Sequence, residues 1–473
     1  MTAAARLKTP GRRKKGFLLV AAWLSVICLQ AAPLAWPAQN LRYADIAEKI
    51  RTSGLRTEYA YELLKKLTGS GPRLTGSAQA AAAVELSRRM MTELGLETWL
   101  EDVTVQHWVR GVEDAAILIP GAEKNSKLRI SALGWSIPTP DSAITAPVLE
   151  IRSFDELQKA GPEAKGKIIF FNHPMDRTVS DTFRAYGEAA AYRARGAAEA
   201  SRWGAAAVIV RSLTLRVDAF PHTGMVQYDP RFLRIPAAAI ATADADRLSA
   251  LLAKEKRVEM RLRLGCQTLP DVPSANVVGQ IRGTDLPDEI ILVGGHLDSW
   301  DLGTGAHDDG AGCVQAMEAL RLIAELGLKP KRTIRAVLFM NEEFGSSGGR
   351  EYARAARRKT EKHLVAMESD RGGFLPVGFG VGGSSAILDR LKTWEELLRP
   401  SGILWFGPGG GGSDIGPLAA QGAVTMSFIP DSQKYFDYHH SALDVLDAVH
   451  PRELELGAIV LAVMAWVLAQ EGI

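Results

Sequence analysis

The stretch EIILVGGHLDSWDLGTGAHDDGAG, residues 289–312, decides the fold class. It opens with the apolar run EIILVGG, which has the length of a strand, and passes through a polar loop into a helical pattern. A strand that is apolar throughout is typical of a parallel sheet covered on both faces. The polar loop that follows such a strand is where α/β proteins place functional side chains.

The same order of strand, loop and helix continues to the C-terminus. Three further apolar runs are predicted to be buried strands: TIRAVLFM (333–340), KHLVAME (362–368) and AVTMSFI (423–429). A closing helix is predicted over RELELGAIVLAVMAWVLAQ, residues 452–470. Alternating β and α elements predict a three-layer α/β/α domain with a mostly parallel central sheet.

The chain of 473 residues is long enough for more than one domain. Residues 269–473 carry the pattern just described, and residues 41–111, with predicted helices and then a strand, form the first part of the same domain. Residues 112–268 contain short β-like runs split by Ala/Arg-rich segments and few candidate catalytic residues. We therefore expect a smaller α/β domain inserted at 112–268.

The N-terminal segment, residues 1–38, is predicted to direct export. Six basic residues and no acid occupy the first fifteen positions, and the uncharged stretch 16–36 follows. This is the layout of a secretory signal, and the stretch is also about long enough to remain as a membrane anchor. Both alternatives stay open, and both predict a periplasmic, secreted or membrane-anchored body.

The rest of the chain does not favour a nucleic-acid partner or a thiolate metal site. The whole chain has a net charge of +2, so it is acidic without the basic tip and lacks the excess that phosphate neutralisation needs. The body contains only Cys266 and Cys313, which are too far apart in sequence for the paired spacing of a thiolate zinc site.

Histidines and carboxylates follow four predicted strands at the points where these strands end. The residues are His296 with Asp298, Asp308 and Asp309; Glu342 and Glu343; Asp370; and His439 and His440. Each pair alone is more often a capping or surface feature, but their joint occurrence at successive strand ends indicates one metal site. Imidazole and carboxylate ligands without thiolate suit catalytic zinc.

These motifs resemble those of the co-catalytic zinc aminopeptidase and glutamate carboxypeptidase family, and most closely its carboxypeptidase Q branch. The matching motifs are GGHLDSWDLGTGAHDDGAG, NEEFGSSGG, MESD, GGGGSDI and YFDYHHSALD, with HWVRG, RSFDEL, KGKII and PHTG in or near the insert. The resemblance covers nearly everything after Tyr43. It implies a zinc exopeptidase domain with an inserted protease-associated-like domain, and a possible homodimer.

The resemblance also implies a role for each residue, with two Zn²⁺ per chain. Asp308 bridges both metals, His296 and Asp370 complete one site, and Glu343 and His440 complete the other. His440 is preferred to His439 because the family's ligand stands four residues before an aspartate. Glu342 is the expected general base that activates a metal-bridging water. A cis peptide bond is expected between Asp308 and Asp309.

Further residues are expected to support the ligands or to touch substrate. Asp298 and Asp309 are expected behind the ligands, with Asp298 orienting the His296 imidazole. His439 is proposed as an oxyanion donor, because related enzymes often have a donor just before this ligand. The loop with Gly411, Gly412, Ser413 and Asp414 is expected to line the substrate cleft. His222, in PHTG, is either structural or reaches a partner's site in a dimer.

The leading hypothesis is hydrolysis of short unblocked peptides, probably dipeptides. An aminoacylase-like hydrolase is disfavoured, because such enzymes usually carry their extra domain between the metal ligands, whereas this insert precedes His296. A glutaminyl cyclase using one zinc, or a receptor-like relative with a dead site, is disfavoured by the complete set of five ligands.

Overall fold

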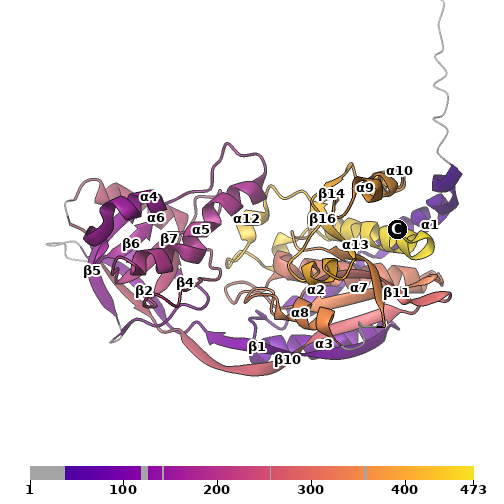
Figure 1. Ribbon diagram of the computed structural model, residues 1–473, viewed down its shortest axis with the longest axis horizontal. Helices are drawn as coiled ribbons and strands as arrows, with labels where there is room; N and C mark the ends of the chain where they lie inside the picture. Colours follow the sequence, from indigo (N-terminus) through magenta and orange to yellow (C-terminus); the bar gives the residue numbers. More distant parts are fainter. Residues whose placement is uncertain (1–37, 119–125, 141–142, 256, 356–359) are drawn as a thin grey trace, which may run out of the picture.

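The computed structural model describes residues 38–118, 126–140, 143–255, 257–355 and 360–473. The predicted leader or anchor lies outside the described residues except for its last position, Ala38, where helix α1 (Ala38–Thr57) begins. The described residues form two eight-stranded sheets, which lie at opposite ends of the molecule in Figure 1.

The first sheet carries the strands predicted from the apolar runs. Its order is β1-β10-β12-β11-β13-β16-β14-β15. The central strands β12, β11, β13 and β16 are parallel to one another, whereas β1, β10 and β14 run antiparallel to neighbours. The parallel centre confirms the predicted fold class, and β14 and β15 are additions. The bounds are β1 Glu97–Val109, β10 Gln267–Ile281, β12 Arg332–Phe339, β11 Leu286–His296, β13 Lys362–Glu368, β16 Val424–Pro430, β14 Pro376–Val381 and β15 Trp405–Pro408.

Helices cover both faces of this sheet and make the three layers. One face packs against α7 (Ala311–Glu325) and α13 (Pro451–Glu471), supported by α1, α2 (Tyr59–Thr68) and α3 (Ala78–Glu93). The other face packs against α8 (Ser347–Arg354) and α11 (Gly416–Ala419). Ile291 and Val293 of β11 enter the first core and Leu292 the second, because successive strand residues point to opposite faces.

Helix α13 is apolar because it lies in the core. Among the described residues it is the one helix long and apolar enough to cross a membrane, yet 83% of its most apolar window is buried inside the protein. It runs beside α7, and the two helices share the largest hydrophobic core of the molecule.

The second sheet has the order β3-β2-β9-β5-β6-β7-β8-β4, with β5 to β8 parallel. Helices α4 (Phe154–Ala160), α5 (Thr182–Ser201) and α6 (Thr242–Leu252) belong to this part. We call residues 113–264, from β2 to β9, the second module; the exact division into domains stays a prediction. The bounds are β3 Ser126–Leu128, β2 Glu113–Leu118, β9 Glu259–Leu264, β5 Ile144–Ile151, β6 Ile168–Phe171, β7 Ala207–Arg211, β8 Ala237–Ile240 and β4 Ile130–Ala132.

The long antiparallel ribbon of β1 and β10 joins the two parts (Figure 1). Where the ribbon meets the second module, the Arg110 guanidinium donates two hydrogen bonds to the Asp301 carboxylate, at 2.9 and 2.5 Å. Asp301 belongs to the loop that follows β11. The ion pair therefore fixes the second module against the loop that carries the predicted site.

Candidate metal centre

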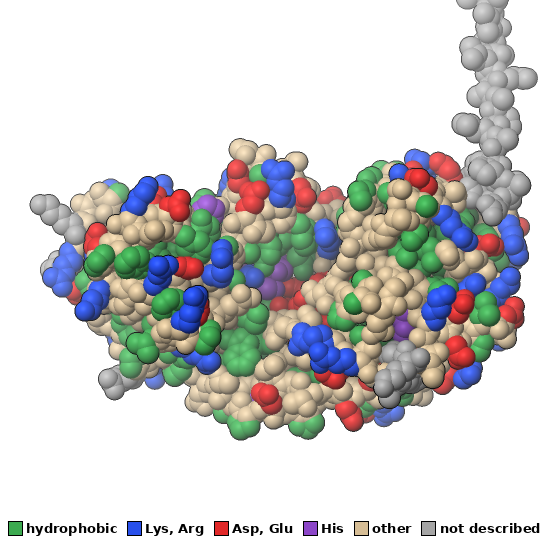
Figure 2. Space-filling model, viewed as in Figure 1, with side chains coloured by type: hydrophobic (Ala, Val, Ile, Leu, Met, Phe, Trp, Pro, Cys, Tyr) green, Lys and Arg blue, Asp and Glu red, His purple; other side chains and the backbone are tan. Residues whose placement is uncertain are grey.

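The ends of four elements and one helical turn bring the predicted ligands together in the hollow between the two parts. Figure 2 shows acidic and histidine side chains gathered there. His296 is the last residue of β11, and Asp308 lies in the helical turn Ala306–Gly310. Glu343 and Asp370 follow β12 and β13, and His440 follows α12 (Tyr435–Tyr438). The structure therefore brings these five side chains together, and their roles as ligands stay a prediction.

The two carboxylate oxygens of Asp308 face two different groups of side chains. Its Oδ1 lies 3.2 Å from His296 Nε2, which is 3.4 Å from Asp370 Oδ1. Its Oδ2 lies 3.2 Å from His440 Nε2, which is also 3.2 Å from Glu343 Oε2. Asp308 thus stands between two clusters, each with one imidazole and a further carboxylate.

The electrostatics show that these clusters attract positive charge. Burial alone would lower the pKa of His440, but the Glu343 and Asp308 carboxylates outweigh it and raise that pKa to about 10. Burial would raise the pKa of Asp308, yet the imidazoles of His296 and His440 beside it hold it well below its ordinary value. Buried carboxylates in this number require cations nearby.

The donor atoms fit metal ions. Asp308 Oδ2 and Glu343 Oε1 are buried and accept no hydrogen bond from the described residues. Three overlapping groups in this region have ligand atoms close enough to share an ion: His296, Asp308 and Glu343; His296, Asp309 and Asp370; and Asp308, His439 and His440. Mixed nitrogen and oxygen donors of this kind suit zinc.

Backbone contacts fix the position of Asp308. The amide groups of His307 and Asp308 donate to the Asp444 carboxylate at 2.7 and 3.1 Å. The Asp308–Asp309 peptide bond is cis, as the resemblance implied. The Asp309 carboxylate accepts a hydrogen bond from the His296 amide at 3.0 Å, so it supports the strand end instead of pointing into the cavity.

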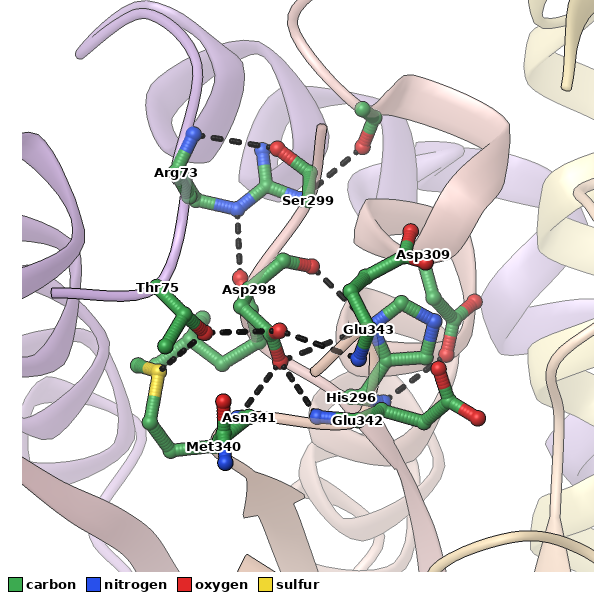
Figure 3. A network of polar contacts seen from close by, with 12 residues as sticks. Arg73, Thr75, His296, Asp298, Ser299, Asp309, Met340, Asn341, Glu342 and Glu343 are labelled. Carbon is green, nitrogen blue, oxygen red and sulfur yellow. Dashed lines mark hydrogen bonds and ion pairs between the residues drawn. The ribbon is translucent and has the colours of Figure 1, made fainter. Parts of the chain in front are cut away.

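Asp298 supports the site in a different way from the one expected. The His296 Nδ1 atom lies 3.0 Å from the backbone carbonyl oxygen of Asp298, whereas the nearest carboxylate oxygen is 3.8 Å away. The Asp298 carboxylate instead accepts amide hydrogen bonds from Asn341, Glu342 and Glu343 (Figure 3). One aspartate therefore orients the imidazole through its main chain and fixes the glutamate turn through its side chain.

Sequence analysis missed two residues that support the loop after β11. Both lie in the segment between α2 and α3. Thr75 Oγ1 donates to Asp298 Oδ2 at 2.8 Å. Arg73 is fully buried and donates to the carbonyl oxygens of Leu297, Thr304 and Gly305, at 2.7, 2.5 and 2.9 Å. Figure 3 shows both side chains next to Asp298. They lie more than 200 positions from their partners, so no local pattern marks them.

Glu342 lies at the mouth of the clusters. Strand β12 ends before it, and the turn is closed by Gly345 N–H donating to the Glu342 carbonyl at 2.9 Å. The predicted break after the strand is therefore present. The Glu342 side chain lines a cavity of about 360 Å³. The other acidic and histidine side chains that line it are Asp308, Glu343, Asp370, His439 and His440. Burial, with the charges of Asp370 and Glu343, raises the pKa of Glu342 to about 8 despite His296.

A second cavity of about 290 Å³ adjoins the first, since Phe183 and Asp370 line both. Gly411, Gly412 and Ser413 line it, and the contact of this loop with substrate stays a prediction. Gly412 must lack a side chain, because a Cβ there would lie 2.3 Å from the Glu368 carboxylate. Asp414 is only 1% exposed and lines neither of these two cavities. Its side chain therefore does not reach the space in which a contact with substrate was expected.

The second module forms one wall of the first cavity. Phe183, Tyr186 and Arg193 of α5 line it, and sequence analysis had singled out none of them. His222 of the same module is buried, and its Nδ1 lies 2.7 Å from the carbonyl oxygen of His439 in the same chain. This contact within the chain supports the structural role that the sequence analysis gave as one alternative for His222.

The fold and this site define a metallopeptidase, and comparison with known proteins agrees. The family model for peptidase family M28 matches residues 276–464. The chain belongs to peptidase family M28, a family of metallo-exopeptidases.

Within the family, the chain is similar to carboxypeptidase Q. It is 38% identical to the bovine protein over 432 residues, which cover 90% of this chain and 89% of the relative. The human protein is also 38% identical, over 430 residues. Among solved structures, a peptidase M28 precursor from Shewanella amazonensis SB2B is 35% identical, with a TM-score of 0.87 over 92% of this chain and 98% of that one. A zinc aminopeptidase from Bacillus subtilis has the same fold, with 20% identity and a TM-score of 0.64 over 88% of this chain and 95% of that one.

Proposed function

We propose that this chain is a di-zinc exopeptidase that hydrolyses short unblocked peptides, dipeptides above all. The observation that carries the proposal is the bridging position of Asp308, whose two oxygens face separate ligand clusters. His296 and Asp370 would hold one zinc with Asp308, and Glu343 and His440 the other. Two zinc ions held there would polarise the scissile carbonyl and lower the pKa of the attacking water.

Glu342 is the residue that we propose moves the proton in this reaction. It lines the cavity beside the ligands without belonging to either cluster around Asp308. Its raised pKa, about 8, keeps the carboxyl group near the range in which it can both accept and return a proton. Glu342 would take the proton of the attacking water and pass it to the amine that leaves.

His439 remains the proposed oxyanion donor. Its ring stacks on the His440 ring with centroids 3.5 Å apart, and it lines the cavity. Burial, together with His440, lowers the pKa of His439 well below its ordinary value, so the ring is neutral and carries one N–H. A neutral imidazole fixed by stacking can donate that N–H to a tetrahedral oxyanion without adding a positive charge beside the metals.

The charges of the two cavities support a dipeptide with free ends. Glu342, Asp370 and Glu368 make the wall near the ligands acidic, which favours a free ammonium group. Across the first cavity, Arg193 is the one Arg or Lys among the described residues that line it. Its Nε is buried and has no hydrogen-bond partner among the described residues. We propose that Arg193 binds the C-terminal carboxylate of the substrate.

Replacement of Arg193 tests this assignment. Arg193→Met is expected to lower kcat/KM for an unblocked dipeptide roughly tenfold to a hundredfold, the value of a charged hydrogen bond. The same variant should hydrolyse the matching dipeptide amide nearly as well as the wild type, because that substrate has no carboxylate. Arg195→Met, an exposed arginine of the same helix, is the matched control. An equal loss on both substrates would contradict the assignment.

The remaining expectations belong to the same proposal. Backbone N–H groups of the loop around Gly411, Gly412 and Ser413 would line the substrate cleft, because these residues border the second cavity. We also propose that the body is exported by its N-terminal segment, which would be either cleaved or kept as an anchor, and that the enzyme forms a homodimer. Fractionation and light scattering of the full chain test these two points.

A further inference from the structure

The PHTG turn of the second module, residues 221–224, makes polar contacts with residues 439–441 (HHS), which include His440. The amide of Thr223 donates to the His440 carbonyl oxygen at 2.9 Å. In return, the His440 Nδ1 atom lies 3.2 Å from the Thr223 carbonyl oxygen. His222 Nδ1 lies 2.7 Å from the carbonyl oxygen of His439. Three polar contacts thus join two segments that are 217 residues apart.

These contacts fix which nitrogen of each imidazole carries the proton. A carbonyl oxygen only accepts, so the Nδ1 atoms of His222 and His440 must be the protonated ones. For His440, this leaves Nε2, which lies 3.2 Å from Asp308 and from Glu343, as the nitrogen that would give up its proton to bind a metal ion. A metal-binding histidine is typically held in this way, by a carbonyl that accepts from its second nitrogen.

The backbone at His440 also needs support from outside. Its φ is +59°, in the left-handed region that residues other than glycine seldom adopt. Such a conformation persists where neighbouring contacts hold it. The PHTG turn supplies these contacts, and it is itself fixed to the second module, because the His222 amide donates to Ser212 Oγ and Thr223 Oγ1 donates to the Ala132 carbonyl.

We propose that the PHTG turn is a working part of the metal site formed by Asp308, Glu343 and His440, with His222 and Thr223 as positioning residues. The second module then does more than wall the cavity: it sets the zinc affinity of one of the two sites. This inference rests on the proposed di-zinc function. It predicts that a change in the turn weakens one metal site and leaves the His296–Asp370 site intact.

The test uses His222, whose side chain reaches His439 but touches no predicted ligand atom. His222→Leu removes the donor to the His439 carbonyl, and His222→Asn replaces it with an amide N–H in a similar place. His173→Leu changes a histidine elsewhere in the same module, whose Nδ1 bonds to the Arg152 carbonyl at 2.9 Å, and serves as the matched control. Each full-length variant is titrated with zinc against a chelator, and its unfolding midpoint is measured without metal.

The wild type and His173→Leu should bind two zinc ions. His222→Leu should bind one with unchanged affinity and the other roughly tenfold to a hundredfold more weakly. His222→Asn should recover most of the second affinity, and the midpoint of metal-free His222→Leu should match that of His173→Leu. Unchanged affinity at both sites in His222→Leu, or equal weakening of both, would overturn the inference alone. A wild type that never binds a second zinc would overturn the proposed function and the inference together.

Discussion

The two ligand clusters of the site share one side chain, Asp308. Most of the residues in these clusters could be predicted from the sequence. His296, Asp308, Glu343 and Asp370 follow strands whose apolar runs are unmistakable in the sequence. Because parallel strands deliver their carboxyl ends to one edge, local patterns sufficed to bring these side chains together. Arg193 and Thr223 could not be found in that way, because they reach the site from another sheet and only the tertiary fold places them there.

At the residue scale, the roles of His439 and His440 can be tested separately. His439→Ala is expected to lower turnover roughly a hundredfold, the typical effect of losing an oxyanion donor. Its zinc content should remain at the wild-type value, because His440 Nε2 is the nitrogen within 3.2 Å of both Asp308 and Glu343. Steady-state kinetics and metal analysis of the same preparation check this. Parallel losses of turnover and zinc would instead make His439 a ligand.

At the scale of elements, the loops after β11 and β12 act as one unit. Asp298 joins them, and Thr75 reaches Asp298 from the segment between α2 and α3. The strands themselves were predictable, but this joint was not, because a single buried hydrogen bond leaves no periodic trace in the sequence. The position of Glu342 therefore depends on a residue that carries no chemistry.

Thr75→Val tests that dependence. Valine has nearly the shape of threonine but no hydroxyl, so the Asp298 carboxylate loses a hydrogen bond of about 1.5–3 kcal/mol. We expect kcat to fall by about tenfold or more as the turn with Glu342 loosens, with little change in KM. Thr75→Ser keeps the donor and should stay close to the wild type. A Thr75→Val enzyme with normal kcat, or a Thr75→Ser enzyme that is equally slow, would show that the contact is not needed.

The packing of α7 against α13 contains a buried acid pair away from the metal site. Glu455 is fully buried, and its Oε2 accepts from the Ala60 amide at 3.0 Å. Burial, and next the charge of Glu318, raise the pKa of Glu455 from 4.5 to about 9. The folded protein therefore keeps a proton that the unfolded chain loses. The stability from this group is complete below pH 4.5 and is lost as the pH rises through about 9.

Glu455→Gln should flatten that pH dependence. The amide oxygen still accepts from Ala60, but the side chain cannot ionise. Between pH 5 and 9 the wild type loses up to about 1.4 kcal/mol of stability per pH unit from this group, and the variant does not. Unfolding midpoints of the metal-free proteins across this range check the difference, with Glu453→Gln on the same helix as the control. Parallel curves for the wild type and Glu455→Gln would contradict the raised pKa.

At the scale of the whole molecule, two parts held in a fixed relation form the first cavity. The β1–β10 ribbon, the Arg110–Asp301 ion pair and the PHTG turn join them at three places around the cavity. The sequence predicted a three-layer α/β part and a second α/β region. It could not predict that the second module supplies a wall of the site, because its residues there, such as Tyr186, are ordinary members of an amphipathic helix.

The most direct test of the central claim is a zinc titration of metal-free enzyme, followed by hydrolysis of a dipeptide and of its N-acetylated form. If Asp308 bridges two metals, hydrolysis of the unblocked dipeptide rises with zinc and reaches its plateau at two ions per chain. The acetylated dipeptide then remains nearly untouched at every point. Hydrolysis of the acetylated form only, or no hydrolysis with two zinc ions bound, would contradict the account.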